Sequence, residues 1–390
     1  MIRKSKIESR TVWDALVIGA GPAGALAARE LSRRGMKTLL IEARSFPRDK
    51  VCGGCFNGRA MAVLESVGLG NLLARLGAVS LSSIEIQTAG RKQQVSLPDS
   101  VAVSRRALDS ALVTEAVHEG SEFLSETSAK VLPQTFDDVR HVTLGQRGGS
   151  SITVRARIVL ACDGLGHSSL HQLPLFRCRV AKRSRIGVGA VGKDDSGTYR
   201  PGQVVMAVGK FGYVGITVVE EGGLNLAASL DAGLLQKRKL RDAVLDILRA
   251  TNTPISETVH QMNFRGTPKL TRTTPLMAAE RLFLLGDATG YIEPFSGEGI
   301  ARALTAACVV APLACRVAAD WTPTIAQQWS RIYKQSLGHR QFISRALAIL
   351  ARHPRATQAA MGCLGIYPQL GEIIARRINT APRLVKGYQS

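Results

Sequence analysis

Residues 15–24 of the 390-residue chain read ALVIGAGPAG. An apolar run typical of a buried strand leads into Gly19, Gly21 and Gly24, and the segment 22–34 that follows is apolar and compatible with a helix. A pyrophosphate needs such a turn, because it must approach the backbone closely and be held by free N–H groups at a helix N-terminus. Side chains at the first two glycines would block this approach, and the third glycine lets the helix pack tightly on the strand.

A second apolar run, residues 37–41, ends at Glu42. An acid in this position accepts hydrogen bonds from a ribose diol. Strand, glycines, helix, second strand and acid thus occur in the required order within one short segment. We therefore predict a dinucleotide-binding βαβ unit and an α/β fold.

Two distant segments carry further signals of a cofactor site. The apolar run 157–162 is too short for a typical helix and ends in Asp163. The run 281–285 leads into Asp287, and then through the glycine-rich residues 297–299 into a long alanine-rich stretch. Both patterns predict a buried strand followed by a turn, and such a turn can place backbone beside a ligand.

These motifs, in this order, resemble those of the FAD-dependent oxidoreductases of the geranylgeranyl reductase and para-hydroxybenzoate hydroxylase type. The resemblance also rests on Arg105 in the pattern Arg-x-x-Leu-Asp and spans residues 12–325. It implies FAD as cofactor and a Rossmann-like FAD-binding domain of the GR2 type, with an inserted, mostly antiparallel β substrate domain and a helical C-terminal tail. The implied boundaries are 12–80, 100–180 and 270–325 for the FAD-binding domain, 81–99 and 181–269 for the substrate domain, and 326–390 for the basic helical C-terminal region.

The resemblance also implies roles for particular residues. The glycines of the first turn and Glu42 would hold the ADP half, Arg105 would approach the pyrophosphate or the flavin, and Asp287 would bond the ribityl chain. Gly297 and Gly299 would face the isoalloxazine, and the positive end of a helix beginning there would favour the anionic reduced flavin by up to ~2 kcal/mol. The full set implied to bind FAD is Gly19, Gly21, Pro22, Ala23, Gly24, Glu42, Ala43, Arg44, Cys52, Arg105, Val131, Asp163, Gly286, Asp287, Gly297, Glu298, Gly299 and Ile300.

Residues 44–55 read RSFPRDKVCGGC and are similar to the Pro-Arg-x-Lys-x-Cys-Gly-Gly run that brings a cysteine beside the flavin in geranylgeranyl reductases. Cys52 aligns with that cysteine, and we predict Cys52, Phe295 and Gly297 as the catalytic residues. The spacing of Cys52 and Cys55 leaves three interpretations open: a redox dithiol, two small packing residues, or a substrate-side role for Cys52. No metal site is expected, since no second cysteine pair or histidine cluster accompanies this one.

The composition is typical of a cytosol-facing enzyme. The chain is 45% hydrophobic, and its seven cysteines are scattered and odd in number, which argues against a disulfide framework. The basic residues 1–6 lead into polar sequence, so we expect no signal peptide. The apolar segment 300–319 contains Arg302, Pro312 and Arg316, and we expect a buried helix there instead of a membrane span.

The net charge is +21, with a pI near 10.2. After residue 330 many basic residues face a single acid, Glu372, and apolar residues such as Ile349, Leu350 and Ile373 interleave with them at helical spacing. Two interpretations remain open: helices at an anionic membrane surface, or helices packed on the body with a solvated basic face. Nucleic-acid binding is not expected, because no reader motif accompanies the charge.

The stretches between the cofactor motifs are typical of short strands joined by glycine-rich turns. Residues 83–97 alternate like a hairpin, and apolar runs occur at 186–191, 203–208 and 224–228. We predict a largely antiparallel sheet that covers the flavin, crossed by a helix over 234–251.

The sequence thus predicts a cytoplasmic enzyme, peripheral at a membrane if the tail is an anchor, that takes a hydride onto FAD. The donor would be external, either NAD(P)H or a reduced carrier, and the small-molecule substrate lipophilic. Phe211 and Tyr213 either line its pocket or pack the sheet. One chemistry is reduction of a carbon–carbon double bond. The alternative is hydroxylation of an aromatic or polyketide substrate through a peroxyflavin, and a less favoured third interpretation is a prenyl-binding carrier without flavin chemistry.

Overall fold

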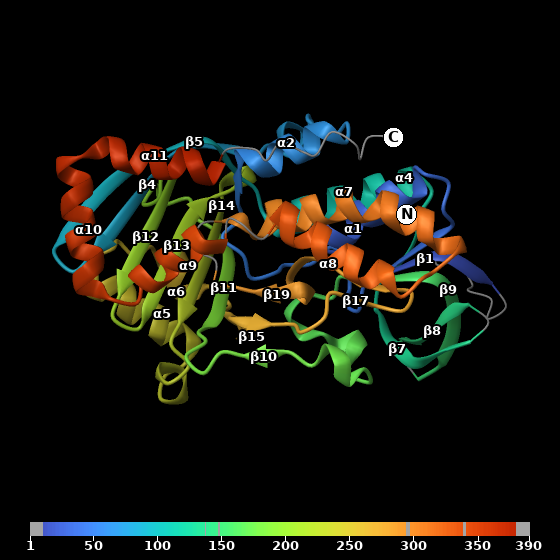
Figure 1. Ribbon diagram of the computed structural model, residues 1–390. Coiled ribbons are helices and arrows are strands. Elements are labelled where there is room, and N and C mark those ends of the chain that lie inside the picture. The colour runs from blue at the N-terminus through green and yellow to red at the C-terminus, as the bar shows by residue number, and fades with distance from the viewer. Residues whose placement is uncertain (1–10, 137, 147–148, 294–296, 338–340, 380–390) are drawn as a thin grey trace.

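The computed structural model describes residues 11–379, apart from 137, 147–148, 294–296 and 338–340. Two large sheets stand side by side, one built around the N-terminal strand and its helices, the other made chiefly from the middle of the chain (Figure 1). The last three helices run along the second sheet.

The first sheet has the order β17-β18-β9-β1-β2-β6, in which β18 to β6 run parallel, and β8 and β7 extend it from β9. Because side chains alternate along a strand, Ala15 and Val17 of β1 face the helices. Leu16 and Ile18 point to the other side of the sheet, where they pack in a second core cluster with residues of β7 and β8. The predicted βαβ unit is confirmed. The strands are β1 Val12–Ile18, β2 Thr38–Ile41, β6 Glu122–Leu124, β7 Thr127–Phe136, β8 Val139–Gln146, β9 Ser151–Ala161, β17 Ala278–Ala279 and β18 Leu282–Leu284.

Small residues bring the helices close to this sheet. Ala25, Ala27 and Ala28 of α1 are fully buried, and α1 packs against both α4 and α7. Among the described residues, α7 is the single helix long and apolar enough to cross a membrane, but 72% of its apolar window is buried in the protein, as predicted for a core helix. The helices around this sheet are α1 Pro22–Ser32, α2 Gly58–Ser66, α3 Leu72–Arg75, α4 Arg105–His118, α7 Glu298–Ala319 and α8 Thr324–Leu337.

The second sheet has the order β15-β11-β14-β13-β12-β4-β5-β3. The predicted hairpin is present as β4 and β5, with Ser83 opposite Ser96. Every described neighbour pair in this sheet is antiparallel except β12 and β4, which run parallel. The strands are β3 Cys55–Asn57, β4 Val79–Thr88, β5 Arg91–Ala102, β11 Ile186–Lys193, β12 Gln203–Gly209, β13 Gly212–Val218, β14 Gly223–Leu230 and β15 Arg265–Lys269.

One face of the second sheet is covered by α5 Leu240–Ala250 and α6 Glu257–Gln261. The helix predicted over 234–251 is shorter than expected, because only a 3-10 turn forms at Leu234–Gln236 and α5 begins after Lys239. The basic run 237–239 lies between the two pieces, and positive charge is unfavourable at a helix N-terminus.

A small third sheet, β10-β16-β19, joins the two larger ones. Its strands are β10 Arg179–Val180, β16 Arg272–Thr273 and β19 Gly290–Tyr291. The other short turns are 3-10 helices at Gly164–Gly166, Ser168–Leu170, Pro174–Phe176, Glu220–Gly222 and Gly286–Thr289.

The C-terminal helices α9 Gln341–Leu350, α10 Pro354–Ile366 and α11 Pro368–Asn379 cover the opposite face of the second sheet (Figure 1). A Cβ on Gly371 of α11 would lie 3.0 Å from Val95 of β5, so this helix rests directly on the strand. Gln358 of α10 donates to the carbonyl oxygen of Ala89 in the β4–β5 turn, at 3.1 Å. The tail therefore packs on the body with one side, as one of its two interpretations predicted.

Candidate active site

The turn between β1 and α1 is closed by tight backbone contacts. Gly19 has φ +102°, and a Cβ there would lie 2.5 Å from the carbonyl oxygen of Cys162 beyond β9. A Cβ on Gly24 would overlap the carbonyl oxygen of Gly19. The protein's own packing therefore requires these two glycines.

Gly21 differs, because the space above it is open. Gly21 precedes α1 with φ −81° and ψ −177°. As a glycine it has no side chain to cap the free N–H groups at the start of the helix. Within 4 Å, a Cβ there would meet the guanidinium groups of Arg105, at 3.5 Å, and Arg48, at 4.0 Å. A helix N-terminus and two guanidinium groups thus face one small space, which is the arrangement that binds an anion.

Buried carboxylates hold the two arginines in place. Nε and Nη2 of Arg105 donate to Asp109 at 2.8 and 2.7 Å, and Arg48 donates to Asp109 and to Glu42, each at 2.8 Å. Burial opposes the charge of Arg105, but Asp109 raises its pKa above the ordinary value, so the guanidinium stays charged. Glu42 also accepts from the backbone N–H of Ala20 at 3.2 Å, which ties the glycine turn to the arginine pair.

Lys50 adds a third basic group near the turn after β9. Its Nζ lies 3.2 Å from the position that a Cβ of Gly164 would take. Burial, followed by repulsion from Arg105, lowers the pKa of Lys50. In the same turn, Asp163 accepts from the N–H of Ser169 at 2.8 Å, while its buried Oδ1 has no hydrogen-bond partner among the described residues. A ligand with a hydrogen-bond donor would satisfy Oδ1 of Asp163, and a phosphate group of a ligand would pair with Lys50.

The turn after β18 and the start of α7 close the site. Gly286, at φ +59°, lies against α1, because a Cβ there would be 3.1 Å from the Cβ of Ala23. Gly297, at φ +69°, precedes α7, and its Cβ would lie 3.7 Å from the carbonyl oxygen of Cys55. The helix predicted to begin near Gly297 begins at Glu298.

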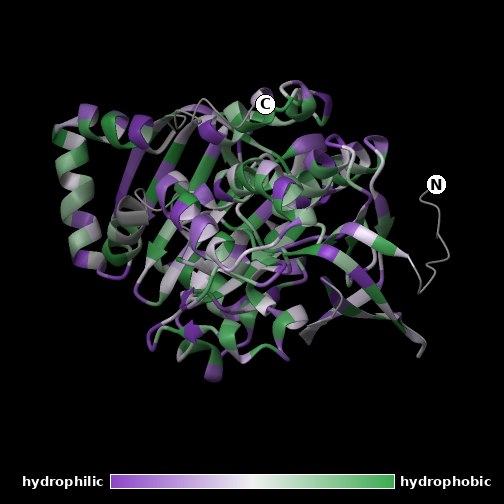
Figure 2. Cartoon of the chain, turned by 45° about the vertical axis from the view of Figure 1, so that its right-hand side comes forward, coloured by the Kyte–Doolittle hydropathy of each residue, from purple (hydrophilic) through white to green (hydrophobic). Residues whose placement is uncertain are grey.

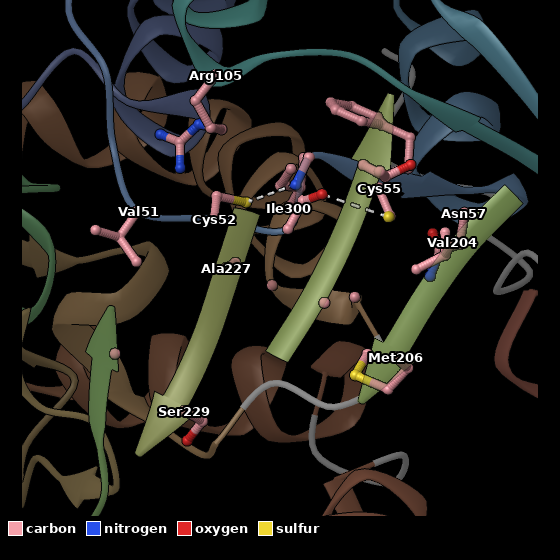
Figure 3. Close-up of a pocket in the computed structure, with 18 of the residues that line it drawn as sticks. Val51, Cys52, Cys55, Asn57, Arg105, Val204, Met206, Ala227, Ser229 and Ile300 are labelled. Carbon is pink, nitrogen blue, oxygen red and sulfur yellow. Dashed lines mark hydrogen bonds between the residues drawn. The ribbon is translucent and has the colours of Figure 1, made fainter. Parts of the chain in front are cut away.

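A cavity of about 370 Å³ joins these parts. Its first part is lined by Gly21, Pro22, Ala23, Lys50, Cys52, Arg105, Gly286, Asp287, Tyr291, Gly297, Gly299 and Ile300. Its distal part is lined by side chains of the second sheet and of the C-terminal helices, among them Ile84, Ile86, Val95, Leu97, Val204, Met206, Tyr213, Leu347, Leu364 and Ile374. Figure 3 shows Arg105 and Cys52 on one side of this space and Val204 and Met206 on the other.

Comparison with known proteins identifies the kind of site. The family described as FAD binding domain matches residues 12–315. The chain belongs to this family. The flavoprotein is therefore an FAD-dependent oxidoreductase, and FAD is its cofactor. The open space above Gly21, framed by a helix N-terminus, Arg48 and Arg105, fits the pyrophosphate of FAD.

Relatives and solved structures extend this result. Menaquinone reductase of Mycobacterium tuberculosis is 27% identical over 370 residues, covering 88% of this chain and 85% of the relative. Digeranylgeranylglycerophospholipid reductase of Methanocaldococcus jannaschii is 22% identical over 349 residues, covering 84% of each. A flavoprotein/dehydrogenase from Cytophaga hutchinsonii has a TM-score of 0.79 at 17% identity, covering 95% of this chain and 93% of that one. The flavin-dependent brominase Bmp2 has a TM-score of 0.72 at 16% identity and 95% coverage of each chain, so these two structures show a shared fold.

The structure brings most of the residues predicted to bind FAD to one place. Ten of them line the cavity: Gly21, Pro22, Ala23, Cys52, Arg105, Gly286, Asp287, Gly297, Gly299 and Ile300. Of the others, Gly19 and Gly24 lie in the glycine turn, Glu42 accepts from the N–H of Ala20 in that turn, and Asp163 and Glu298 adjoin lining residues. Ala43 and Arg44 follow Glu42 in the chain and are not among the described residues that line the cavity. Val131 is not brought to the cavity, since it is fully buried on β7 in the core, and Phe295 lies outside the described residues. The role of each of these residues in binding FAD or in catalysis stays a prediction.

Sequence reasoning missed Arg48, Lys50, Asp109 and Tyr291. The signal for the first two was present, because both belong to the Pro-Arg-x-Lys-x-Cys-Gly-Gly run, in which only the cysteine received a role. Asp109 follows Arg105 by one helical turn and was visible in the Arg-x-x-Leu-Asp pattern. Nothing local in the sequence marks Tyr291.

The two cysteines of the 52–55 loop occupy different environments. Asn225 of β14 donates to the carbonyl oxygen of Cys52 at 2.8 Å and so fixes the loop against the second sheet. Cys55 donates to the carbonyl oxygen of Gly53 at 3.5 Å, and burial, with a smaller contribution from Cys52, raises the pKa of Cys55 to about 12. Cys55 is therefore a thiol and not a nucleophile at neutral pH, and the three interpretations of the pair stay open.

A buried ion network connects the C-terminal helices to the segment before α7. Glu293, 1% exposed, accepts from Arg185 at 3.0 Å and from Arg352 at 2.5 Å. Arg185 also pairs with Asp231 at 2.8 Å and lies 5.9 Å from the ring centre of Tyr213. Tyr213 lines the cavity and is buried. Phe211, the other aromatic residue considered for the pocket, is 44% exposed and is not among the described residues that line it.

Proposed function

We propose that this flavoprotein reduces a carbon–carbon double bond of a lipophilic substrate, with electrons from NAD(P)H or a reduced carrier. The observation that carries the proposal is the continuity of the cavity, which starts at Gly21, Cys52 and Gly297 and continues along apolar side chains such as Val204 and Met206. A hydrocarbon chain gains about 0.8 kcal/mol for each CH₂ buried in such surroundings. The two relatives named above are reductases whose names specify menaquinone and a glycerophospholipid, both lipids.

The chain's own groups suit this reaction. FAD, when bound, supplies a hydride equivalent. The N-terminus of α7, preceded by Gly297, would favour negative charge near it, while the apolar walls exclude water. The second hydrogen of the product arrives as a proton, and Tyr291 is our candidate donor because it lines the cavity. Burial raises the pKa of Tyr291, so the phenol is protonated at neutral pH but is a weak acid.

Anaerobic turnover tests the proposal. The FAD-loaded protein is reduced chemically without oxygen and mixed with polyprenyl lipids, while the flavin absorbance and the mass of the lipid are followed. We expect rapid flavin oxidation and a product heavier by two hydrogens. Reoxidation that needs oxygen and yields a hydroxylated aromatic product would replace this proposal by the monooxygenase alternative.

A cavity variant separates the substrate from the cofactor. Met206→Trp places bulk in the apolar part of the cavity, away from the residues predicted to hold FAD. We expect unchanged FAD content and loss of activity toward long lipids. Leu175→Trp is the control, because Leu175 is 62% exposed and does not line the cavity. Equal activity of both variants would show that the lipid does not occupy this space.

We also propose a cytoplasmic location at a membrane, because a substrate of this class resides in a bilayer and the chain carries a net charge of +21. The carrier interpretation without flavin is set aside, since the chain belongs to an FAD-dependent family.

A further inference from the structure

Exposed apolar side chains gather where α10 turns into α11. Ile366 is 72% exposed, Tyr367 62%, Leu370 46%, Ile373 49% and Ile374 41%, and we call these five residues the α10–α11 corner. Other exposed large apolar residues of the described chain are scattered over different elements. Figure 2 shows hydrophobic residues along the C-terminal helices at the outer edge of the molecule. A concentrated exposed apolar patch marks an interaction surface.

Basic residues lie on the same two helices. Arg376 and Arg377 of α11 follow the corner and are exposed, Arg355 is exposed at the far end of α10, and Glu372 is the single acidic residue after position 330. Alternation of exposed apolar and basic side chains on short helices is typical of segments that lie in a membrane interface. With 13 and 12 residues, α10 and α11 are shorter than the ~20 residues that a membrane span requires. The corner therefore suits a surface of anionic lipid, which attracts basic side chains.

The same corner borders the cavity. Leu364, Gly371, Ile374 and Ala375 line the cavity, and Ile374 is at the same time 41% exposed. One side chain thus faces both the cavity and the exterior, which places a mouth of the cavity beside α11. A lipid entering from water would first have to expose its hydrocarbon chain, whereas a lipid entering from a bilayer would not.

We propose that the α10–α11 corner docks into the surface of an anionic lipid bilayer and that the lipid substrate passes from the bilayer into the cavity beside Ile374. The choice of substrate rests on the proposed function. The docking itself rests on the exposed apolar residues, the charge and the cavity mouth.

Vesicle binding tests the docking. The full-length, FAD-loaded protein is sedimented with vesicles of phosphatidylcholine plus phosphatidylglycerol, and with vesicles of phosphatidylcholine alone. We expect binding to the anionic vesicles that weakens with salt, and at least a tenfold loss of affinity in the double variant Ile366→Glu/Ile373→Glu. The matched control is Leu175→Glu/Val191→Glu, which alters two exposed apolar residues elsewhere, 62% and 44% exposed, and should bind as wild type.

Three results would overturn the docking proposal. The corner variant would bind the vesicles as wild type does, or both variants would lose binding equally. Alternatively, wild type would be a dimer that does not bind vesicles and that the corner variant converts to a monomer, which would make a second copy the occupant.

Activity then separates this inference from the proposed function. With the lipid presented in anionic vesicles, the corner variant should lose at least tenfold in kcat/KM, and with the same lipid in detergent it should match wild type, with unchanged FAD content. Equal loss in detergent would overturn the role of the corner in delivery. If no polyprenyl lipid is reduced in either form but vesicle binding follows the corner, the proposed function fails and the docking stands.

Discussion

Alanine substitutions at two glycines of the first turn should have different effects: one should lower the stability of the protein, and the other should lower its affinity for FAD. In Gly24→Ala the new methyl group overlaps the carbonyl oxygen of Gly19, so α1 must move away from the turn. In Gly21→Ala the methyl group lies 3.5 Å from Arg105 Nη2, an ordinary contact, at a φ of −81° that any residue adopts. The first change therefore acts on the protein, and the second acts on its ligand.

The structure sets the expected magnitudes. Overpacking costs about 1–3 kcal/mol, and the overlap with a backbone oxygen points to the upper part of that range, about 2–3 kcal/mol. Alanine gains ~1 kcal/mol over glycine inside a helix, so apo Gly24→Ala should lose about 1–2 kcal/mol of stability. Apo Gly21→Ala should lose less than ~1 kcal/mol, the usual effect at an N-cap. Its methyl group, however, takes the space assigned to the pyrophosphate. Loss of one charged hydrogen bond costs about 1.5–3 kcal/mol, so Kd for FAD should rise about 10- to 100-fold.

Urea unfolding of the apoprotein and titration with FAD, followed by quenching of its fluorescence, measure the two quantities separately. Gly166→Ala is the control, because a Cβ there meets nothing within 4 Å. If Gly21→Ala binds FAD as tightly as wild type, the pyrophosphate does not lie above Gly21. If apo Gly24→Ala keeps the stability of wild type, the contact with the turn is not rigid.

Three further outcomes follow from groups in and around the cavity. Burial raises the pKa of Cys55 to about 12, so iodoacetamide at about pH 8 should label exposed Cys363 far faster, with labelling of Cys55 increasing as the pH approaches 12; equal labelling by mass spectrometry would contradict this. Arg185→Ala should cost about 3–5 kcal/mol in urea unfolding, because the Arg185 side chain is 1% exposed and its loss leaves both Glu293 and Asp231 without this buried partner. Arg352→Ala should cost about 1 kcal/mol or less, because the Arg352 side chain is 25% exposed and water can take its place; equal losses would refute this ranking. Tyr291→Phe should lower turnover about 100-fold without loss of FAD, and unchanged turnover would exclude it as the proton donor.

The parts of the fold that follow from local pattern were predictable. The βαβ unit depends on glycines that the chain must have at fixed spacing, and two of them indeed meet backbone carbonyls, at Cys162 and Gly19. The β4–β5 hairpin depends on the alternation of polar and apolar residues, which the sequence shows at 83–86 and again at 94–97 on either side of a polar turn. Both signals lie within one short segment.

The parts that depend on distant contacts were not predictable. Arg48 gains its role because the 44–55 loop folds back onto Asp109 of α4, a contact that no spacing announces. The start of α5 moved because charge at its N-terminus competed with the apolar pattern. The amphipathic pattern of the C-terminal helices shows that each helix has an apolar side. It does not show which part of the protein covers that side. The structure shows that α11 covers β5, while Ile366 and Ile373 stay exposed.

The parallel pairing of β4 with β12 in the second sheet also has a consequence for biosynthesis. The β4–β5 hairpin leaves the ribosome early, but its partner β12 emerges only after β6 to β9 of the first sheet have been made. Until then, the edge of β4 that will pair with β12 is open, and unpaired strand edges promote association with other chains. The cavity wall is therefore among the last parts to form, and we expect soluble yield to depend on chaperones and growth temperature more than the stability of the finished flavoprotein would indicate.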